Sequence, residues 1–279
     1  TWNATNGILV SGLNLPLTAG YMTSSGLKQQ NYQNSRMNIE STELQNSTET
    51  AIGYIPCYRL PFLSLFHADC MEIMKQYPDK YFDLAIVDPP YGNVAVFDNC
   101  QPLERKNERP KKYEDKEWDK AKPTAEYWEQ IFRVSKNQIV WGGNYFTSYL
   151  PESRGWIYWD KNNGENNFSD GELAWTSFKK RLISCKKNSK AETRGGKDRF
   201  HPTQKPVYVY DFTLRNFATE GMKILDTHFG SGSIALAVDK ANRLDKMNLH
   251  LTACEIDKEY IDKAIKRISE SIKQGTLSF

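Results

Sequence analysis

The stretch YFDLAIVDPPY, residues 81–91, decides the fold on which the rest of the chain builds. Its apolar run ends in β-branched residues and is stopped by two prolines, which predicts a buried strand over 81–87. Neither proline has an N–H group, so the turn offers carbonyl oxygens together with the carboxylate of Asp88 and the ring of Tyr91. These groups suit a flat ring that bears an amino group, because they provide acceptors for its N–H bonds and a surface for stacking. A plain strand-ending turn is the alternative.

The composition is typical of a globular protein, with 39% apolar and 25% charged residues in a chain of 279. This length suits one large domain or a domain with an insertion. No apolar run is long enough to span a membrane, and no basic segment followed by an apolar one marks a secretory signal. The five cysteines lack CxxC spacing, which argues against a disulfide framework or a zinc site. We therefore expect a cytoplasmic protein without a metal.

Positive charge is concentrated in one segment of the chain. Residues 179–205 hold ten Lys or Arg and two acidic residues, a local balance of +8 in a chain whose net charge is +3. A basic segment on an otherwise slightly acidic body is typical of a surface that binds a polyanion. A solvated surface loop is the alternative.

The chain divides by composition into an N-terminal arm and one folded domain. Residues 1–50 are rich in Asn, Ser, Thr and Gln, which predicts an extended or poorly ordered arm before a domain over 51–279. Within the domain, sparse apolar residues predict a charged loop over 95–123. Apolar patterning predicts strands at 63–67, 81–87, 138–141, 156–159, 173–178, 223–225 and 249–254. It predicts helices at 71–76, 124–135, 233–240 and 257–273, and a further helix that follows the motif at 201–206 and ends at about 217. Their alternation indicates an α/β fold with a mostly parallel central sheet.

A second strand end also carries ligand-binding chemistry. Asp226 ends one predicted strand, and the turn FGSG at 229–232 leads directly into a helix. Glycines let the backbone approach a ligand closely, and a helix N-terminus offers free N–H groups. Glu255 ends the next strand, where a carboxylate can accept both hydroxyls of a ribose. The turn lacks the G-x-G-x-x-G pattern of an NAD site, so it favours a nucleoside ligand without a pyrophosphate, such as S-adenosylmethionine.

Taken together, these motifs resemble those of the beta-class DNA amino-methyltransferases, in which the catalytic tetrapeptide precedes the cofactor-binding motifs. The resemblance covers about residues 63–272 and rests on DPPY at 88–91, HPTQKP at 201–206, FGSG at 229–232 and Glu255. It implies a Rossmann-like, S-adenosylmethionine-dependent methyltransferase fold with a circularly permuted motif order.

The permuted order also predicts how the strands are arranged. The strands near 225 and 252 would be central, with the strand near 65 beside the latter and the strand near 86 beside the former. Asp226 and Asp88 would then meet at the topological switch point, where open α/β sheets bind ligands. A small target-recognition insertion is expected at about 160–200.

The resemblance assigns roles to individual residues. The catalytic residues it implies are Asp88, Pro89, Pro90 and Tyr91. In the cofactor site Asp69 would contact the adenine, Glu255 the ribose and Lys205 the methionine end. The full set of cofactor-binding residues it implies is Asp69, Asp88, His201, Lys205, Asp226, Phe229, Gly230, Ser231, Gly232, Glu255 and Ile256. The predicted DNA-binding residues are Lys179, Lys180, Arg181, Lys186, Lys187, Arg194, Lys197 and Arg199.

The activity implied is direct methyl transfer to an exocyclic amine of a base that is flipped out of double-stranded DNA. By resemblance, Asp at the first position of the tetrapeptide favours adenine N6, and cytosine N4 is the alternative. A non-catalytic DNA-binding protein that holds the cofactor is a rival from another class, against which the intact Asp88, Tyr91 and Glu255 argue. RNA is a further alternative substrate. The resemblance also fits a prokaryotic or phage restriction-modification enzyme and allows a homodimer, with no metal and no membrane.

Overall fold

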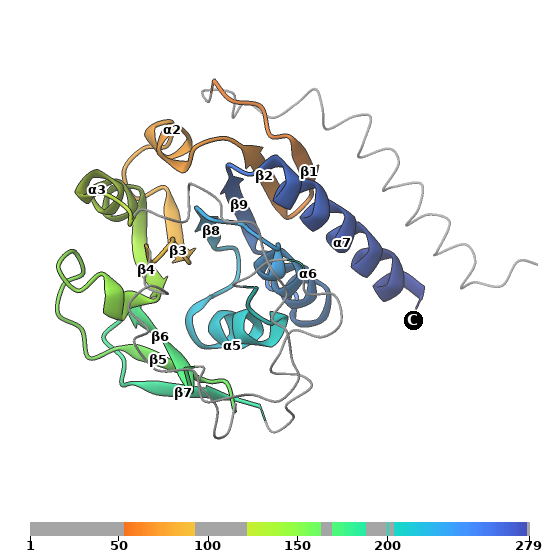
Figure 1. Cartoon of the computed structure of the whole chain (residues 1–279). Coiled ribbons are helices and arrows are strands. Elements are labelled where there is room, and N and C mark those ends of the chain that lie inside the picture. The colour runs from red at the N-terminus through yellow and green to blue at the C-terminus, as the bar shows by residue number, and fades with distance from the viewer. Residues whose placement is uncertain (1–52, 93–121, 163–168, 188–199, 201–203, 278–279) are drawn as a thin grey trace, which may run out of the picture. The chain divides into compact units, whose positions relative to one another are not determined.

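The computed structural model describes residues 53–92, 122–162, 169–187, 200 and 204–277. The predicted N-terminal arm and almost all of the charged loop lie outside these residues. Within them, a nine-stranded sheet is the centre of the fold (Figure 1). Its strands are β1 (Tyr58–Leu60), β2 (Leu63–His67), β3 (Phe82–Val87), β4 (Ser135–Trp141), β5 (Trp156–Asp160), β6 (Gly171–Thr176), β7 (Ile183–Lys186), β8 (Lys223–Asp226) and β9 (His250–Glu255). The helices are α2 (Cys70–Lys75), α3 (Ala125–Val134), α5 (Val207–Phe217), α6 (Ser233–Asp245), α7 (Lys258–Leu277) and the 3₁₀ turn η3 (Gly143–Tyr145).

The strand order is β1-β2-β9-β8-β3-β4-β6-β5-β7. The pairs from β2 to β4 are parallel, whereas β1 and β6 pair antiparallel with their neighbours. This confirms the prediction that β8 and β9 are central, with β2 beside β9 and β3 beside β8. Because these parallel strands end at the same edge of the sheet, the acids at the ends of β3, β8 and β9 are brought together.

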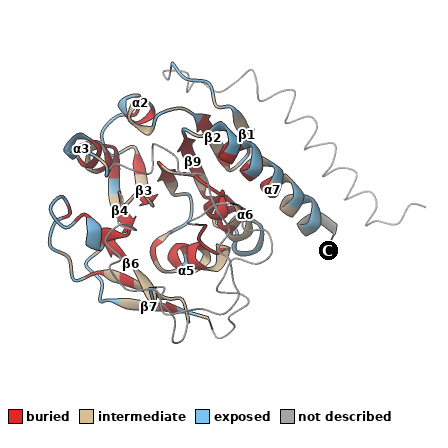
Figure 2. Ribbon diagram, in the orientation of Figure 1, coloured by how far each residue is buried: buried red, intermediate tan, exposed pale blue. Residues whose placement is uncertain are grey.

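Two apolar layers cover the two faces of the sheet. Leu84 and Ile86 of β3 pack in the layer that contains α5, α6 and α7, whereas Ala85 and Val87 pack in the layer of α2 and α3. A strand buried on both faces has a continuous apolar run, which explains the pattern of residues 84–87. Figure 2 shows the buried strands of the sheet and the exposed outer sides of α2, α3 and α7.

The structure contains strands that apolar patterning did not predict. The short strand β1 pairs with β2, and β7 lies inside the basic segment, where it pairs in parallel with β5. In β7 only Cys185 is buried, so the strand has little apolar signal of its own and depends on its neighbour. Strand β4 and helix α6 are longer than predicted. In the described part of the chain, no helix has the length and apolar character that a membrane span requires.

Candidate active site

The turn after β3 places an acid beside an aromatic ring. The Tyr91 hydroxyl donates a hydrogen bond of 2.7 Å to Asp88 Oδ1. The Tyr91 ring stacks on Tyr145, with ring centroids 4.9 Å apart and 26° between the planes. On the side of Gly142, which has a φ of +66°, the approach is so close that a Cβ atom would lie 2.2 Å from the Tyr91 ring. The ring is therefore held by its hydroxyl, by a stacking partner and by backbone.

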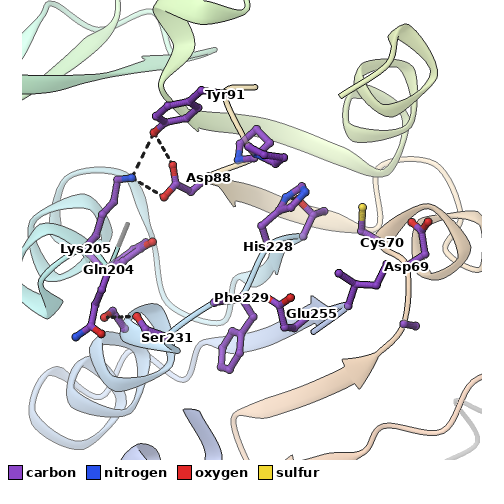
Figure 3. Close-up of a pocket in the computed structure, with 18 of the residues that line it drawn as sticks. Asp69, Cys70, Asp88, Tyr91, Gln204, Lys205, His228, Phe229, Ser231 and Glu255 are labelled. Atoms are coloured by element: carbon purple, nitrogen blue, oxygen red, sulfur yellow. Dashed lines mark hydrogen bonds and ion pairs between the residues drawn. The ribbon is translucent and has the colours of Figure 1, made fainter. Parts of the chain in front are cut away.

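Lys205 provides a cation at the same turn. Its Nζ lies 2.5 Å from Asp88 Oδ2 and 3.5 Å from the Tyr91 hydroxyl (Figure 3). The Lys205 side chain is only 2% exposed, and a cation buried to this extent needs anionic partners. The sequence interpretation assigned Lys205 to the methionine end of the cofactor and did not predict its ion pair with Asp88. Lys205 lines the cavity, and its ammonium group contacts Asp88, the acid that the resemblance predicts to be catalytic.

These groups open onto a cavity of about 380 Å³ at the carboxyl ends of the strands. This volume is within the range of ligand pockets, roughly 300–1,000 Å³. Eleven of the residues predicted from the sequence line it, namely Asp69, Asp88, Pro89, Pro90, Tyr91, Lys205, Phe229, Gly230, Ser231, Glu255 and Ile256. The structure therefore brings the two strand-end motifs to one site.

The Gly-rich turn is tied to the end of β9. The Gly230 N–H donates to Glu255 Oε2 at 2.8 Å, and the Asp257 N–H donates to Glu255 Oε1 at 2.9 Å. Arg267 of α7 donates to the carbonyl of Ser231 at 2.9 Å. At the opposite turn, Asp69 caps α2 by accepting the Met71 N–H at 2.8 Å. Backbone N–H groups thus orient the two carboxylates predicted to bind adenine and ribose.

Two predicted cofactor residues support the cavity without lining it. Asp226 is buried, and its Oδ1 accepts the His228 N–H at 3.0 Å. Gly232 has a φ of +70° at the N-cap of α6. Both residues therefore shape the turn between β8 and α6. His201 lies outside the described residues.

The predicted site residues did not include eight others that line the cavity, namely Ala68, Cys70, Gly92, Gln204, Tyr210, Thr227, His228 and Ser233. Gln204 is the most informative of them. Its Oε1 accepts the Phe200 N–H at 3.2 Å, whereas its buried Nε2 has no hydrogen-bond partner among the described residues. A buried donor without a partner is a candidate ligand contact. Its position within the HPTQKP motif at 201–206 could have indicated such a contact from the sequence.

Burial sets the protonation states around the cavity. Burial, followed by the charge of Asp88, raises the pKa of Tyr91 well above its usual range, so the hydroxyl stays a donor. Burial lowers the pKa of His228 to about 4, which leaves a neutral imidazole. Burial also raises the pKa of Glu255. For Lys205, burial alone would lower the pKa, but the carboxylates of Asp88 and Glu172 outweigh it and raise the value.

Asp226 makes the stability of the ligand-free protein depend on pH. Burial above all, with Asp88 and Glu255 adding to it, raises the pKa of Asp226 to about 8 from an ordinary value of 3.8. Between these two values the folded state binds a proton that the unfolded state does not, so stability falls as pH rises. We expect Asp226→Asn, which retains an acceptor for His228, to melt at a higher temperature than the wild type, with a difference that grows from pH 5 to pH 9.

Thermal unfolding at several pH values checks this expectation. Asp262→Asn is the control, because it removes the same charge from an exposed ion pair on α7. A difference between Asp226→Asn and the wild type that stays constant over this range would contradict the account.

The basic segment is only partly described. Lys179 and Arg181 are exposed. Lys180 and Lys186 are exposed too, but they have partners within the chain: the carbonyl of Asn216 for the first and Asp160, at 2.9 Å, for the second. The ammonium group of Lys187 lies over a ring, that of Tyr208, and the predicted DNA-binding residues Arg194, Lys197 and Arg199 lie outside the described residues. Contact with DNA stays a prediction for all eight basic residues.

The fold and the site together define a class of protein. The sheet is mostly parallel, with an acid-bearing turn after β3, a Gly-rich turn after β8 and an acid at the end of β9. This is the Rossmann-like fold of S-adenosylmethionine-dependent methyltransferases. A family model described as DNA methylase, of the N6/N4 type, matches residues 111–266, which is more than half of the chain. The chain belongs to this DNA methylase family.

Individual relatives are distant. The chain is 25% identical to the type II methyltransferase M2.DpnII of Streptococcus pneumoniae over 76% of this chain and 92% of that protein. It is 22% identical to the type II methyltransferase M2.LlaDCHI of Lactococcus lactis subsp. cremoris, over 79% and 94%. Among solved structures, the cytosine-N4-specific PvuII DNA methyltransferase matches with a TM-score of 0.49 and 15% identity, over 77% of this chain and 89% of that one.

Proposed function

We propose that the protein transfers the methyl group of S-adenosylmethionine to N6 of adenine in double-stranded DNA. The DNA methyltransferase activity follows from membership of the family, and S-adenosylmethionine is its cofactor. The choice of adenine is our proposal. The observation that supports it is the carboxylate of Asp88, which lines the cavity beside Tyr91, since Asp at this position favours adenine in the family that the sequence resembles.

The residues around the cavity fit the cofactor. The buried Nε2 of Gln204, which has no partner among the described residues, is a donor for the carboxylate of an amino acid. The carboxylates of Asp69 and Glu255 complement the amino group of an adenine and the hydroxyls of a ribose. Gly230 lets the backbone approach closely. When bound, the cofactor supplies a methyl group on an electrophilic sulfonium.

Asp88 has the geometry to orient an amine. An ionised carboxylate has about four lone-pair sites, so Asp88 can accept hydrogens from a base while it keeps its bonds to Tyr91 and Lys205. Hydrogen bonds to Asp88 and to the Pro89 carbonyl would hold the amine pyramidal, with its lone pair directed at the methyl group. Alignment of this kind can supply roughly 7–11 kcal/mol of the barrier reduction. A strong base is unnecessary, because the amine can lose its proton after the attack.

Tyr91 is the surface on which the base would stack. A target base must leave the duplex at a cost of a few kcal/mol, and stacking on an aromatic ring returns about 1–3 kcal/mol. Tyr145, which is 38% exposed, stacks on Tyr91 in the ligand-free protein, so a base that stacks on that face of Tyr91 takes the place of the Tyr145 ring. We further propose that the exposed basic residues of the segment 179–187 contact DNA phosphates. We also propose that the protein acts in the cytoplasm of a prokaryotic cell, where the chromosomal DNA lies. A homodimer stays a prediction.

The test is incubation with S-adenosylmethionine and unmethylated double-stranded DNA of mixed sequence, followed by mass spectrometry of the nucleosides. We expect N6-methyladenine, in amounts that increase with time and enzyme. N4-methylcytosine would contradict the choice of base and keep the mechanism. A parallel reaction with RNA, and a measurement of cofactor binding by calorimetry, distinguish an RNA enzyme and a non-catalytic binder if no DNA base is methylated.

A further inference from the structure

A chain of ion pairs, centred on the buried Lys205, extends from the turn after β3 to the antiparallel part of the sheet. Lys205 Nζ lies 2.5 Å from Asp88 Oδ2 and 3.0 Å from Glu172 Oε2, and Lys161 Nζ lies 2.6 Å from Glu172 Oε1. The charges alternate from Asp88 through Lys205 and Glu172 to Lys161. Glu172 belongs to β6, two strands away from β3 in the sheet, and none of the sequence motifs includes it.

We propose that Glu172 is a positioning residue for methyl transfer, which acts through Lys205 to hold the carboxylate of Asp88 in its catalytic orientation. The proposal rests on the function proposed above. Glu172 is not among the residues that line the described cavity, so its effect on the reaction is transmitted by the Lys205 ammonium group.

The need for a second anion follows from the burial of Lys205. Its side chain is 2% exposed, and a buried cation with one partner is destabilised when that partner has to share its lone pairs with another group. Asp88 has to accept hydrogen bonds from the amine during the reaction. Glu172 gives Lys205 a permanent anionic partner, so that the ammonium group stays charged and in place while Asp88 engages the base.

Glu172 is itself rigidly placed. It lies opposite Trp159 in the pairing of β6 with β5, and the preceding Gly171 packs so closely that a Cβ would lie 2.3 Å from the Tyr158 ring. The contact from Lys205 reaches Glu172 Oε2 without the alignment of a hydrogen bond, so it acts as an ion pair. Its strength therefore depends on the charge of Glu172.

The surroundings of Lys205 determine how it responds to pH. The groups that interact with it are Asp88 and Tyr91 after β3, Glu172 on β6, the Trp141 ring of β4 at 5.2 Å and Asp226 on β8; Tyr210 on α5 lines the same cavity. Burial opposes the charged form, and the two nearest carboxylates maintain it. Removing the charge of Glu172 lowers the pKa of Lys205. The ammonium group is then lost at a lower pH, and the alkaline limb of the rate profile moves in the same direction.

The decisive variant is Glu172→Gln, assayed for kcat and KM with S-adenosylmethionine and DNA across pH. We expect kcat to fall by about 10²-fold, because a small displacement of a catalytic group has an effect of this size. We expect KM for both substrates to stay near the wild-type values, and kcat to decline at a lower pH than in the wild type. Glu172→Asp keeps the charge, so it should recover part of kcat and restore the alkaline limb.

Controls separate this role from a structural one. Glu259→Gln removes a carboxylate from an exposed ion pair with Lys263 on α7 and should leave every parameter unchanged. A Glu172→Gln enzyme with wild-type kcat, or one that loses activity with an unshifted pH profile, would overturn the inference. If Glu172→Gln does not fold, Glu172→Asp decides, since an unchanged kcat there overturns it too. Absence of methylation by the wild type would overturn the proposed function itself.

Discussion

Asp88→Asn is expected to lower kcat for DNA methylation by about 10²–10³-fold, the usual effect of removing one preorganised electrostatic contact to a transition state. The amide keeps the volume of the carboxylate and one acceptor oxygen, but it replaces the other with a donor. It therefore cannot bind Lys205 and accept hydrogens from the amine as the carboxylate does. Because methyl transfer depends on the direction of the amine lone pair, the loss should appear in kcat, with cofactor affinity within a few-fold of the wild type.

The measurement is the initial rate of transfer of a radioactive methyl group to DNA, with cofactor affinity measured by calorimetry. Asp211→Asn is a matched control, because Asp211 also pairs with a lysine, Lys240, at 2.5 Å and lies outside the active-site cavity. This control should retain the wild-type rate. An Asp88→Asn enzyme that keeps its rate within a few-fold would show that the turn after β3 has a role other than orienting the amine.

Gly142→Ala is expected to reduce activity by about 10- to 100-fold, which corresponds to the loss of roughly 1–3 kcal/mol of base stacking. A Cβ at this position would lie 2.2 Å from the Tyr91 ring, so the ring has to leave the place where it stacks. The φ of +66° adds a backbone cost of about 1–2 kcal/mol for any residue with a Cβ. The variant should therefore lose both stability and activity.

Gly221→Ala separates these two effects. Gly221 has a φ of +76°, so an alanine there has a similar backbone cost, but nothing lies within 4 Å of the Cβ that the substitution adds. We expect both variants to lose stability in thermal unfolding, Gly142→Ala by more because its Cβ also displaces the Tyr91 ring, whereas only Gly142→Ala loses activity. Fluorescence of 2-aminopurine at the target position reports base flipping and should weaken only in Gly142→Ala. Equal activity of the two variants would contradict the role given to Tyr91.

The sequence by itself determined the chemistry of the strand ends. Prolines after an apolar run, a Gly-rich turn before a helix and an acid at the end of a strand are local signals, because each depends on the backbone preferences of adjacent residues. From them the α/β class was predictable, and the family resemblance that these motifs support added the order of the central strands and the eleven predicted residues that line the cavity. Strand β7 was not, because its four residues have little apolar character and depend on pairing with β5.

Only the tertiary structure decided which side chains meet. Lys205 and Asp88 are separated by 117 positions in the sequence, and their ion pair exists because β3 and the N-terminus of α5 converge at one edge of the sheet. Glu172 of β6 is the second carboxylate beside Lys205. Its position depends on the order of β4, β6, β5 and β7, which sequence patterning did not predict. Local preferences fix the direction of the chain over a few residues, whereas the partner of a buried charge depends on packing between distant elements. For this reason the sequence identified the turn that we propose to be catalytic, and the structure identified the groups that hold it.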